Sequence, residues 1–205
     1  MAVIVLVSAA GSPGVTTTGV GFALTADRPT LLVEADPTGG SAVLAGLWQP
    51  LAGVLSGLEA LGQDVVVDGG RLGLEGWPEP LLAGADLVLL TVRSDLVALA
   101  AARSWAETLR AGREQGGGVG VGLLLVGEGR PYSSREISAV LQLPVTATLA
   151  WDDGSAAVFS RGAVPARRFD RAPLPRSLRT ARMALEAQLA AARAALEPLP
   201  VEVQR

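Results

Sequence analysis

The sequence predicts an α/β fold in which helices flank a doubly wound, mostly parallel β-sheet. Three observations lead to this prediction: short apolar runs alternate with helical segments, the runs are continuous, and 205 residues are enough for one buried core but too few for two. Strands that are buried on both faces of a parallel sheet consist of unbroken Val and Leu. We therefore expect a single domain over residues 1–205 with right-handed crossover connections.

Six apolar runs carry the strand pattern. They are residues 2–8, 30–35, 64–68, 86–92, 119–126 and 144–149. The candidate helices between them cover residues 15–26, 41–47, 52–61, 95–114 and 133–142. The glycine-rich segment 115–122 is expected to be a loop that enters a strand rather than a linker between domains.

One amphipathic helix is predicted over residues 176–197. Its apolar stripe has three- and four-residue spacing and contains Leu178, Leu185, Leu189, Ala192 and Leu196. The apolar face holds Ala and Leu without Trp or Phe, which favours packing against the sheet over insertion into lipid. Membrane binding is therefore not expected.

The composition excludes several kinds of chemistry. The chain has no Cys and no His, which excludes thiolate nucleophiles, Cys/His zinc sites, histidine bases and disulfides. All 17 basic residues are Arg, because the sequence contains no Lys. No apolar run approaches the roughly 18 residues of a membrane-spanning helix, and no basic residue precedes the first run as in a secretory signal. The expected location is the cytoplasm.

The segment AAGSPGVTTTG, residues 9–19, has the form of a phosphate-binding loop. It connects the first strand to the first helix, which is where phosphates bind in such folds. Gly11 and Gly14 allow a tight turn, and the hydroxyl of Thr16 could reach Mg²⁺. Asp36 and Asp68 close the next two strands, so three strand ends direct polar groups to one crevice.

These motifs resemble those of the MinD/ParA family of P-loop ATPases, whose deviant Walker A motif reads KGGxGK[ST]T. Gly11, Gly14, Thr16 and Thr17 match that motif, Ser12 replaces its second glycine, and Pro13 fills its free position. Ala10 and Val15 stand where the family has its signature lysine and its P-loop lysine. The resemblance covers most of the chain, but only the first 40 residues and the segment DVVVDGG, residues 64–70, carry specific motifs.

The resemblance implies a P-loop NTPase-like domain that binds ATP and Mg²⁺. The loop residues would be Gly11, Ser12, Gly14, Val15, Thr16 and Thr17, and the metal-linked residues Thr16, Asp36 and Asp68. Asp36 stands at the position of the family's water-orienting or metal-linked aspartate. It would be the catalytic residue if the chain were active. The family's adenine-contacting asparagine has no clear counterpart here. Asp36 and Asp68 could instead have structural roles, either capping a loop or pairing with an arginine.

The missing lysines lead us to expect weak or lost nucleotide chemistry. A P-loop lysine gives a full positive charge to the β- and γ-phosphates. A charge-assisted contact contributes about 1.5–3 kcal/mol, so its loss should weaken binding by about tenfold to a hundredfold. In the family, the signature lysine also reaches the partner's nucleotide across a dimer. Arg71 and Arg93, just beyond strand ends, are the candidates to replace a lysine, or else are solvated loop residues.

A basic segment near the C-terminus is the second candidate site. Residues 161–182 hold seven arginines against one acid, Asp170, while residues 1–129 hold six arginines against thirteen acids. ParA proteins bind DNA without sequence preference through basic residues near the C-terminus, so this resemblance and the charge both suggest a DNA-binding face. The alternative is a solvated or intramolecularly paired surface. The candidates are Arg161, Arg167, Arg168, Arg171, Arg176, Arg179 and Arg182.

From the sequence we interpret the protein as a MinD/ParA-like pseudo-ATPase, a self-associating scaffold or adaptor in positioning, partition or assembly. It would form a homodimer or larger assembly, bind an unknown protein partner, and need no cofactor unless ATP and Mg²⁺ binding is retained. A weak ATP-dependent switch and a nonspecific DNA-binding protein are the alternatives. Trp48, Trp77, Trp105 and Trp151 are expected as core or interface anchors rather than ligand stackers.

Overall fold

The computed structural model describes residues 2–10, 13–36, 63–73, 79–116 and 120–196 of the chain. Within them, six strands form one sheet in the order β2-β3-β1-β4-β5-β6, and every neighbouring pair is parallel. The strands are β1 (Val3–Ser8), β2 (Thr30–Glu34), β3 (Asp64–Arg71), β4 (Leu87–Arg93), β5 (Gly120–Val126) and β6 (Val145–Leu149). The predicted parallel α/β sheet is therefore confirmed.

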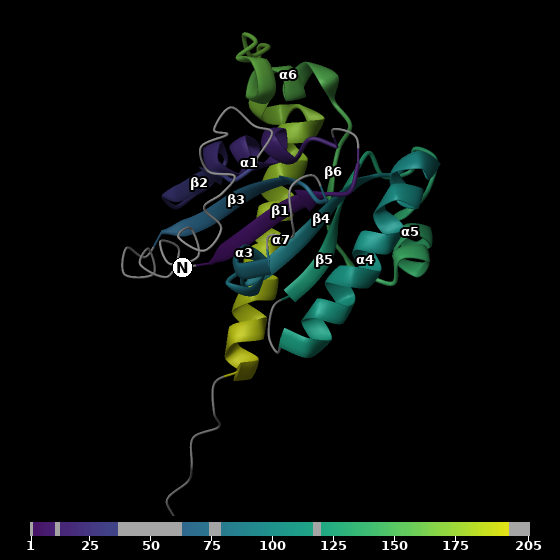
Figure 1. Cartoon of the computed structure of the whole chain (residues 1–205). Helices are drawn as coiled ribbons and strands as arrows, with labels where there is room; N and C mark the ends of the chain where they lie inside the picture. The colour runs from purple at the N-terminus through teal and green to yellow at the C-terminus, as the bar shows by residue number, and fades with distance from the viewer. Residues whose placement is uncertain (1, 11–12, 37–62, 74–78, 117–119, 197–205) are drawn as a thin grey trace, which may run out of the picture.

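Helices cover both faces of this sheet (Figure 1). One face carries α1 (Val15–Leu24), α6 (Asp153–Arg161) and α7 (Pro173–Leu196), and a short 3-10 helix, η3 (Phe169–Arg171), precedes α7. The other face carries α3 (Glu79–Ala83), α4 (Leu96–Gly116) and α5 (Ser134–Leu141). Helices α3, α6 and η3 were not predicted from the sequence. The predicted helices at 41–47 and 52–61 lie outside the described residues.

The alternation of side chains along the strands divides the core into two apolar clusters. Along β1, Val3, Val5 and Val7 belong to the cluster beneath α4 and α5. Ile4 and Leu6 belong to the cluster beneath α1 and α7. Both faces of β1 are thus buried, which is why its sequence is a continuous apolar run.

The third strand continues beyond its predicted end at residue 68 to Arg71. The pairing of β1 with β3 shifts register between Leu6 and Ser8, so that Ser8 lies opposite Arg71. Gly70 has a φ of 63°, a left-handed conformation that glycine adopts without strain, and the strand passes through it. The two glycines after Asp68 therefore extend the strand through an irregularity instead of ending it.

The amphipathic C-terminal helix packs on the sheet, as expected. Leu178, Leu185 and Leu189 are buried in the cluster shared with α1. The helix begins three residues before its predicted start, at Pro173, because proline needs no hydrogen-bonded N–H in the first turn of a helix. Among the described residues, no helix is both long and apolar enough to span a membrane.

Arg182 lies inside this packing and corrects one prediction. Only 8% of its surface is exposed. Its guanidinium donates to the Phe22 carbonyl at 3.1 Å, to Thr30 Oγ1 at 3.1 Å and to Asp64 Oδ2 at 3.3 Å. A further hydrogen bond of 2.9 Å joins it to Glu186 Oε1. Arg182 therefore connects α7 to α1, β2 and β3 and is not available to DNA.

Candidate functional site

The first helix begins as a phosphate-binding loop requires. Gly14 is the N-cap residue of α1 and has a φ of 97°, a conformation that favours glycine. Its carbonyl accepts the first helical hydrogen bond, from the N–H of Thr18, at 2.8 Å. Gly11 and Ser12 lie outside the described residues. On either side of these two residues the structure has the strand, which ends at Ser8, and the helix, which starts at Val15, as the sequence predicted.

Thr16 and Asp68 meet at the carboxyl end of the sheet. Thr16 Oγ1 donates to Asp68 Oδ2 at 2.6 Å, and the N–H of Gly70 donates to Asp68 Oδ1 at 2.9 Å. Burial raises the pKa of the Asp68 carboxyl, the two hydrogen bonds oppose this rise, and the nearby carboxylates of Asp36 and Glu34 add to it. The hydroxyl therefore holds a buried carboxylate in place.

Asp36 lies beside this pair. A Cβ placed on Gly70 would come within 2.3 Å of the Asp36 carboxyl carbon, so the backbone at Gly70 passes directly against that carboxylate. The structure thus brings together Thr16, Asp36 and Asp68, the residues that the resemblance assigns to Mg²⁺. Hydroxyl and carboxylate oxygens fit that ion. In the described part of the chain, no three acidic, His or Cys residues form a metal site, so an ion here would need oxygens from a ligand as well.

The two positions at which the family resemblance would place a lysine differ in their surroundings. Val15, in place of the P-loop lysine, is 6% exposed and packs into the cluster with Leu6 and Leu174. Ala10, in place of the signature lysine, is partly exposed. The valine therefore contributes apolar packing to the domain, where a lysine would direct an ammonium group at phosphate.

The two arginine candidates lie at the ends of neighbouring strands. Arg71 is exposed at the end of β3. The guanidinium carbon of Arg93, at the end of β4, lies 4.5 Å from the ring centroid of Trp151, and Arg93 Nε lies 3.4 Å from Asp95 Oδ2. Arg93 is thus held along the carboxyl edge of the sheet by a cation–π contact and an exposed ion pair.

Two adjoining pockets open along this edge. One, of about 170 Å³, lies between α1 and α6 and is lined by Gly14, Thr17, Leu149 and Ala156 among others. The other, of about 280 Å³, is lined by Arg93, Ser94, Asp95, Val126, Gly127, Arg130 and Trp151. Both pockets include Val126 and Trp151 in their walls, so together they continue from the loop along the strand ends.

Arg130 and Trp151 line this edge of the sheet, and Arg130 was not among the candidate residues of the sequence. Trp151 is partly exposed, lines both pockets and stacks with Arg93, and its expected role as a core or interface anchor stays a prediction. Trp105 does pack against the core beneath α4, as expected, while Trp48 and Trp77 lie outside the described residues. The signal that was available is a tryptophan two residues after a predicted strand, at the edge where ligands bind in α/β sheets.

Asp152 begins α6 at the edge of the same pocket. Burial acts to raise the pKa of this carboxyl, but hydrogen bonds from Ser155 and from the backbone N–H of Leu174 outweigh burial and lower it. The carboxylate accepts from the N–H of Ser155 at 3.1 Å and caps the helix. Asp152 therefore has a structural role as the N-cap of α6.

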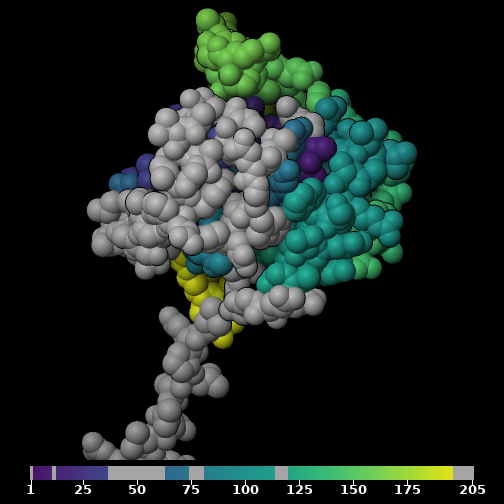
Figure 2. All heavy atoms as spheres, in the orientation of Figure 1, coloured from purple at the N-terminus to yellow at the C-terminus, as the bar shows by residue number. Residues whose placement is uncertain are grey.

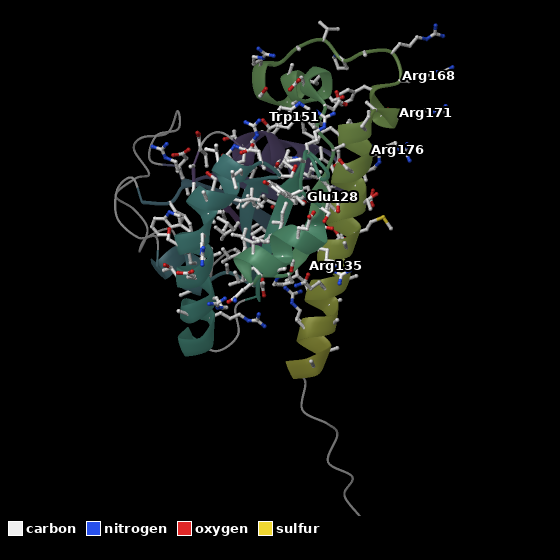
Figure 3. All side chains as sticks on the ribbon, turned by 90° about the vertical axis from the view of Figure 1, so that its right-hand side faces the viewer. Glu128, Arg135, Trp151, Arg168, Arg171 and Arg176 are labelled. Atoms are coloured by element: carbon white, nitrogen blue, oxygen red, sulfur yellow. The ribbon has the colours of Figure 1, made fainter. Side chains whose placement is uncertain are left out.

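Six of the seven arginines that the sequence suggests for DNA binding lie toward the end of the molecule where α6 lies, and five of the six are exposed. Arg168, Arg171 and Arg176 extend outward from the segment before α7 and from its first turns (Figure 3). Arg161 and Arg167 are also exposed, and Arg179 is half-buried with its guanidinium donating to the Asp170 carbonyl. Figure 2 shows α6 and the loop after it projecting from the rest of the molecule. We call these six arginines the basic surface.

Comparison with solved structures identifies the fold. No protein-family model and no curated protein matches the chain. MinD cell division protein from Aquifex aeolicus superposes with a TM-score of 0.71 at 16% identity, covering 98% of this chain and 100% of that one. The septum site-determining protein MinD from Pyrococcus horikoshii, complexed with Mg-ADP, gives 0.67 at 16%, covering 93% and 97%. A ParA family ATPase from Chlorobium tepidum gives 0.67 at 13%, covering 90% and 98%. The chain therefore has the fold of MinD and the ParA-family ATPases, as its motifs led us to expect.

Proposed function

We propose that this protein is a MinD/ParA-like scaffold or adaptor that associates with itself and has lost ATP hydrolysis. The observation that carries the proposal is the loop at the start of α1. Gly14 and the Thr16–Asp68 hydrogen bond keep its shape, while Val15 is buried in the core where the family has its lysine. Shape is thus retained without the cation that stabilises charge on the transferred phosphoryl group.

A role in positioning or assembly is supported by the proteins that share the fold. The solved structures include a cell division protein and a septum site-determining protein, both MinD, and a ParA family ATPase. We extend from them only the general role, in which the protein acts by binding partners, including a second copy of itself.

The decisive experiment measures assembly and turnover on the same sample. Light scattering after size-exclusion chromatography should show an assembly larger than a monomer whose mass is unchanged by Mg-ATP. Phosphate release should not exceed the rate without protein. A monomer that dimerises only with Mg-ATP and then releases phosphate would refute the proposal and support a nucleotide-dependent switch.

The weak ATP-dependent switch remains the second candidate because the metal-linked side chains meet. Thr16, Asp36 and Asp68 could hold Mg²⁺ if a nucleotide supplied the other oxygens. Bound Mg²⁺ would neutralise phosphate charge and polarise the transferred group. A variant with Thr16→Val should abolish Mg-dependent nucleotide binding under this candidate function and leave nucleotide-free assembly unchanged under the first.

DNA binding is the third candidate and rests on the basic surface. Five of its six arginines are exposed, Arg179 is half-buried, and Asp170 is the one acid between residues 161 and 182. An electrostatic site binds any sequence and weakens steeply with salt. A mobility shift that is lost on replacing Arg168, Arg171 and Arg176 by Gln, and on raising the salt, would support it. An absent shift at low salt would exclude it.

A further inference from the structure

The pocket between the ends of β4, β5 and β6 holds two arginines around one tryptophan. Arg93 stacks on the Trp151 ring at 4.5 Å. A Cβ placed on Gly127 would lie 3.5 Å from Trp151 Cε3 and 3.7 Å from Arg130 Cδ, so the ring and the Arg130 stem meet over this glycine. Figure 3 shows Trp151 at the end of the molecule where α6 lies. The two cationic side chains therefore converge on one aromatic wall.

Register places this cluster on the same side of the sheet as the loop. Ser8 of β1 pairs with Thr91 of β4, and Arg93 follows two residues later. Side chains two residues apart on a strand share a face, and Leu87 and Leu89 belong to the cluster that includes Val15 of α1. Arg93 is thus on the α1 face. The Thr91 hydroxyl on the same face is buried and has no hydrogen-bond partner among the described residues.

The acidic side chains of the two pockets already have structural partners. Asp95 accepts from the N–H of Ala98 at 2.9 Å near the start of α4, and Asp152 caps α6. Asp153 accepts from Trp151 Nε1 at 3.2 Å. Helix N-termini carry a partial positive charge that compensates the carboxylates lying at them. These acids therefore oppose an anion in the pocket less than their formal charges suggest.

The arginines are less fully satisfied. The ion pair of Arg93 with Asp95 joins side chains that are 43% and 38% exposed, and an ion pair this exposed contributes little. Within the described part of the chain, the Arg130 guanidinium forms no hydrogen bond or ion pair. Two guanidiniums beside a pocket, with donors to spare, are suited to a phosphate group, which accepts their hydrogen bonds in pairs.

We propose that Arg93 and Arg130 bind the phosphate group of a small phosphate-bearing ligand, whose less polar part occupies the pocket between α1 and α6. Leu149, Ala156 and Leu174 give that pocket an apolar lining, and Trp151 separates the two halves. The phosphate then lies beyond the lysine-less loop, at a site that the loop does not form. This proposal goes beyond the scaffold function and does not depend on it.

The test uses the full chain, calorimetry and three probes: ADP, inorganic pyrophosphate and adenosine. ADP should bind most tightly, because it fills both pockets. Arg93→Ala and Arg130→Ala should each weaken ADP and pyrophosphate binding by about tenfold or more, the usual effect of a lost charge-assisted contact. Arg93→Lys should fall between wild type and alanine, because it keeps the charge but loses the paired donors. Arg103→Ala is the matched control, since Arg103 is 72% exposed on α4 and lies outside both pockets.

Tryptophan fluorescence provides a second readout. A ligand that draws the Arg93 guanidinium away from the Trp151 ring should change the tryptophan emission of the wild-type protein. Trp151→Phe should lose that change while calorimetry still detects binding. Thermal unfolding of each variant shows whether it is folded.

Several results would overturn the proposal. One is that neither ADP nor pyrophosphate binds at millimolar concentration. Another is that Arg103→Ala weakens ADP binding as much as Arg93→Ala does. A third is that ADP binding is unaffected by Arg93→Ala but abolished by Thr16→Val. The last result would place the phosphate at the loop. Light scattering on the same samples tests the scaffold separately, because a protein that remains monomeric refutes the scaffold whatever the ligand does.

Discussion

Replacing Arg182 by methionine should destabilise the domain strongly while leaving any DNA binding unchanged. The guanidinium hydrogen-bonds to the Phe22 carbonyl, Thr30, Asp64 and Glu186, and all but the last contact lie on other elements of the fold. Methionine keeps most of the apolar stem, so the change removes mainly the hydrogen bonds and the charge. It therefore tests the structural role of Arg182 against the DNA-binding role that the sequence predicted.

The magnitude follows from what the substitution leaves behind. Breaking a buried ion pair costs about 3–5 kcal/mol when the remaining charge has no other partner. Asp64 keeps Arg28 at 3.0 Å and the N–H of Ala2 at 3.0 Å, so its charge remains compensated. The loss of stability then comes from the broken hydrogen bonds, each contributing about 1 kcal/mol, and from the Phe22 carbonyl, which loses this partner. We expect a loss of about 3 kcal/mol in the free energy of unfolding.

Urea unfolding followed by circular dichroism measures this loss, and Arg176→Met is the matched control. Arg176 is exposed on the same helix, so its replacement should change stability by less than about 0.5 kcal/mol. If the protein binds DNA, the two variants should behave oppositely, with Arg176→Met weakening the complex and Arg182→Met leaving it intact. A loss below about 1 kcal/mol for Arg182→Met, or equal losses for both variants, would refute the buried network as a stabilising element.

Three further predictions concern the crevice. Restoring both lysines, as Ala10→Lys and Val15→Lys, should raise Mg-ATP affinity by about tenfold or more if the loop is otherwise competent, and calorimetry measures this. Because the folded state raises the pKa of Asp68, folding favours the protonated carboxyl. The stability that this carboxyl contributes is therefore fully present below its ordinary pKa of 3.8 and is lost as the pH rises through the folded-state pKa. Urea midpoints should therefore shift in favour of Asp68→Asn, relative to wild type, between pH 3 and pH 7, and a constant difference would contradict the raised pKa. Gly70→Ala should cost about 1–3 kcal/mol, since its φ is 63° and the new Cβ would meet the Asp36 carboxyl carbon at 2.3 Å, whereas Gly112→Ala, where a Cβ meets nothing, is the control.

The fold could be predicted because the pattern that reveals it is local. Each strand buried on both faces has to be a continuous apolar run, so each run in the sequence marks one strand. The short helices were missed because they lack such a continuous pattern. The ends of α6 are set by caps, Asp152 at one end and Gly162 at the other, while its nine residues carry no long apolar stripe.

The candidate site could be predicted only in part. Thr16 and Asp68 could be named as candidates because they occupy fixed positions in a motif, and a hydrogen bond of 2.6 Å joins Thr16 Oγ1 to Asp68 Oδ2. Arg182 was misassigned because a sequence shows the charge of a residue but not its burial. The Arg93–Trp151 contact joins residues at the ends of two strands that are not neighbours in the sheet, so no spacing in the sequence could have revealed it.

The shape of the loop is physically independent of the lysine that the family places in it. The turn depends on the left-handed conformation of Gly14, and the carboxylate of Asp68 is held by Thr16 and by the N–H of Gly70. None of these contacts involves the side chain at residue 15, where valine adds apolar burial beneath α7. A lysine at this position would have to keep its ammonium group out of that apolar cluster, which costs stability unless a phosphate or water receives it. Under the proposed function, valine at this position therefore avoids that cost, and the start of α1 is kept by contacts that need no lysine.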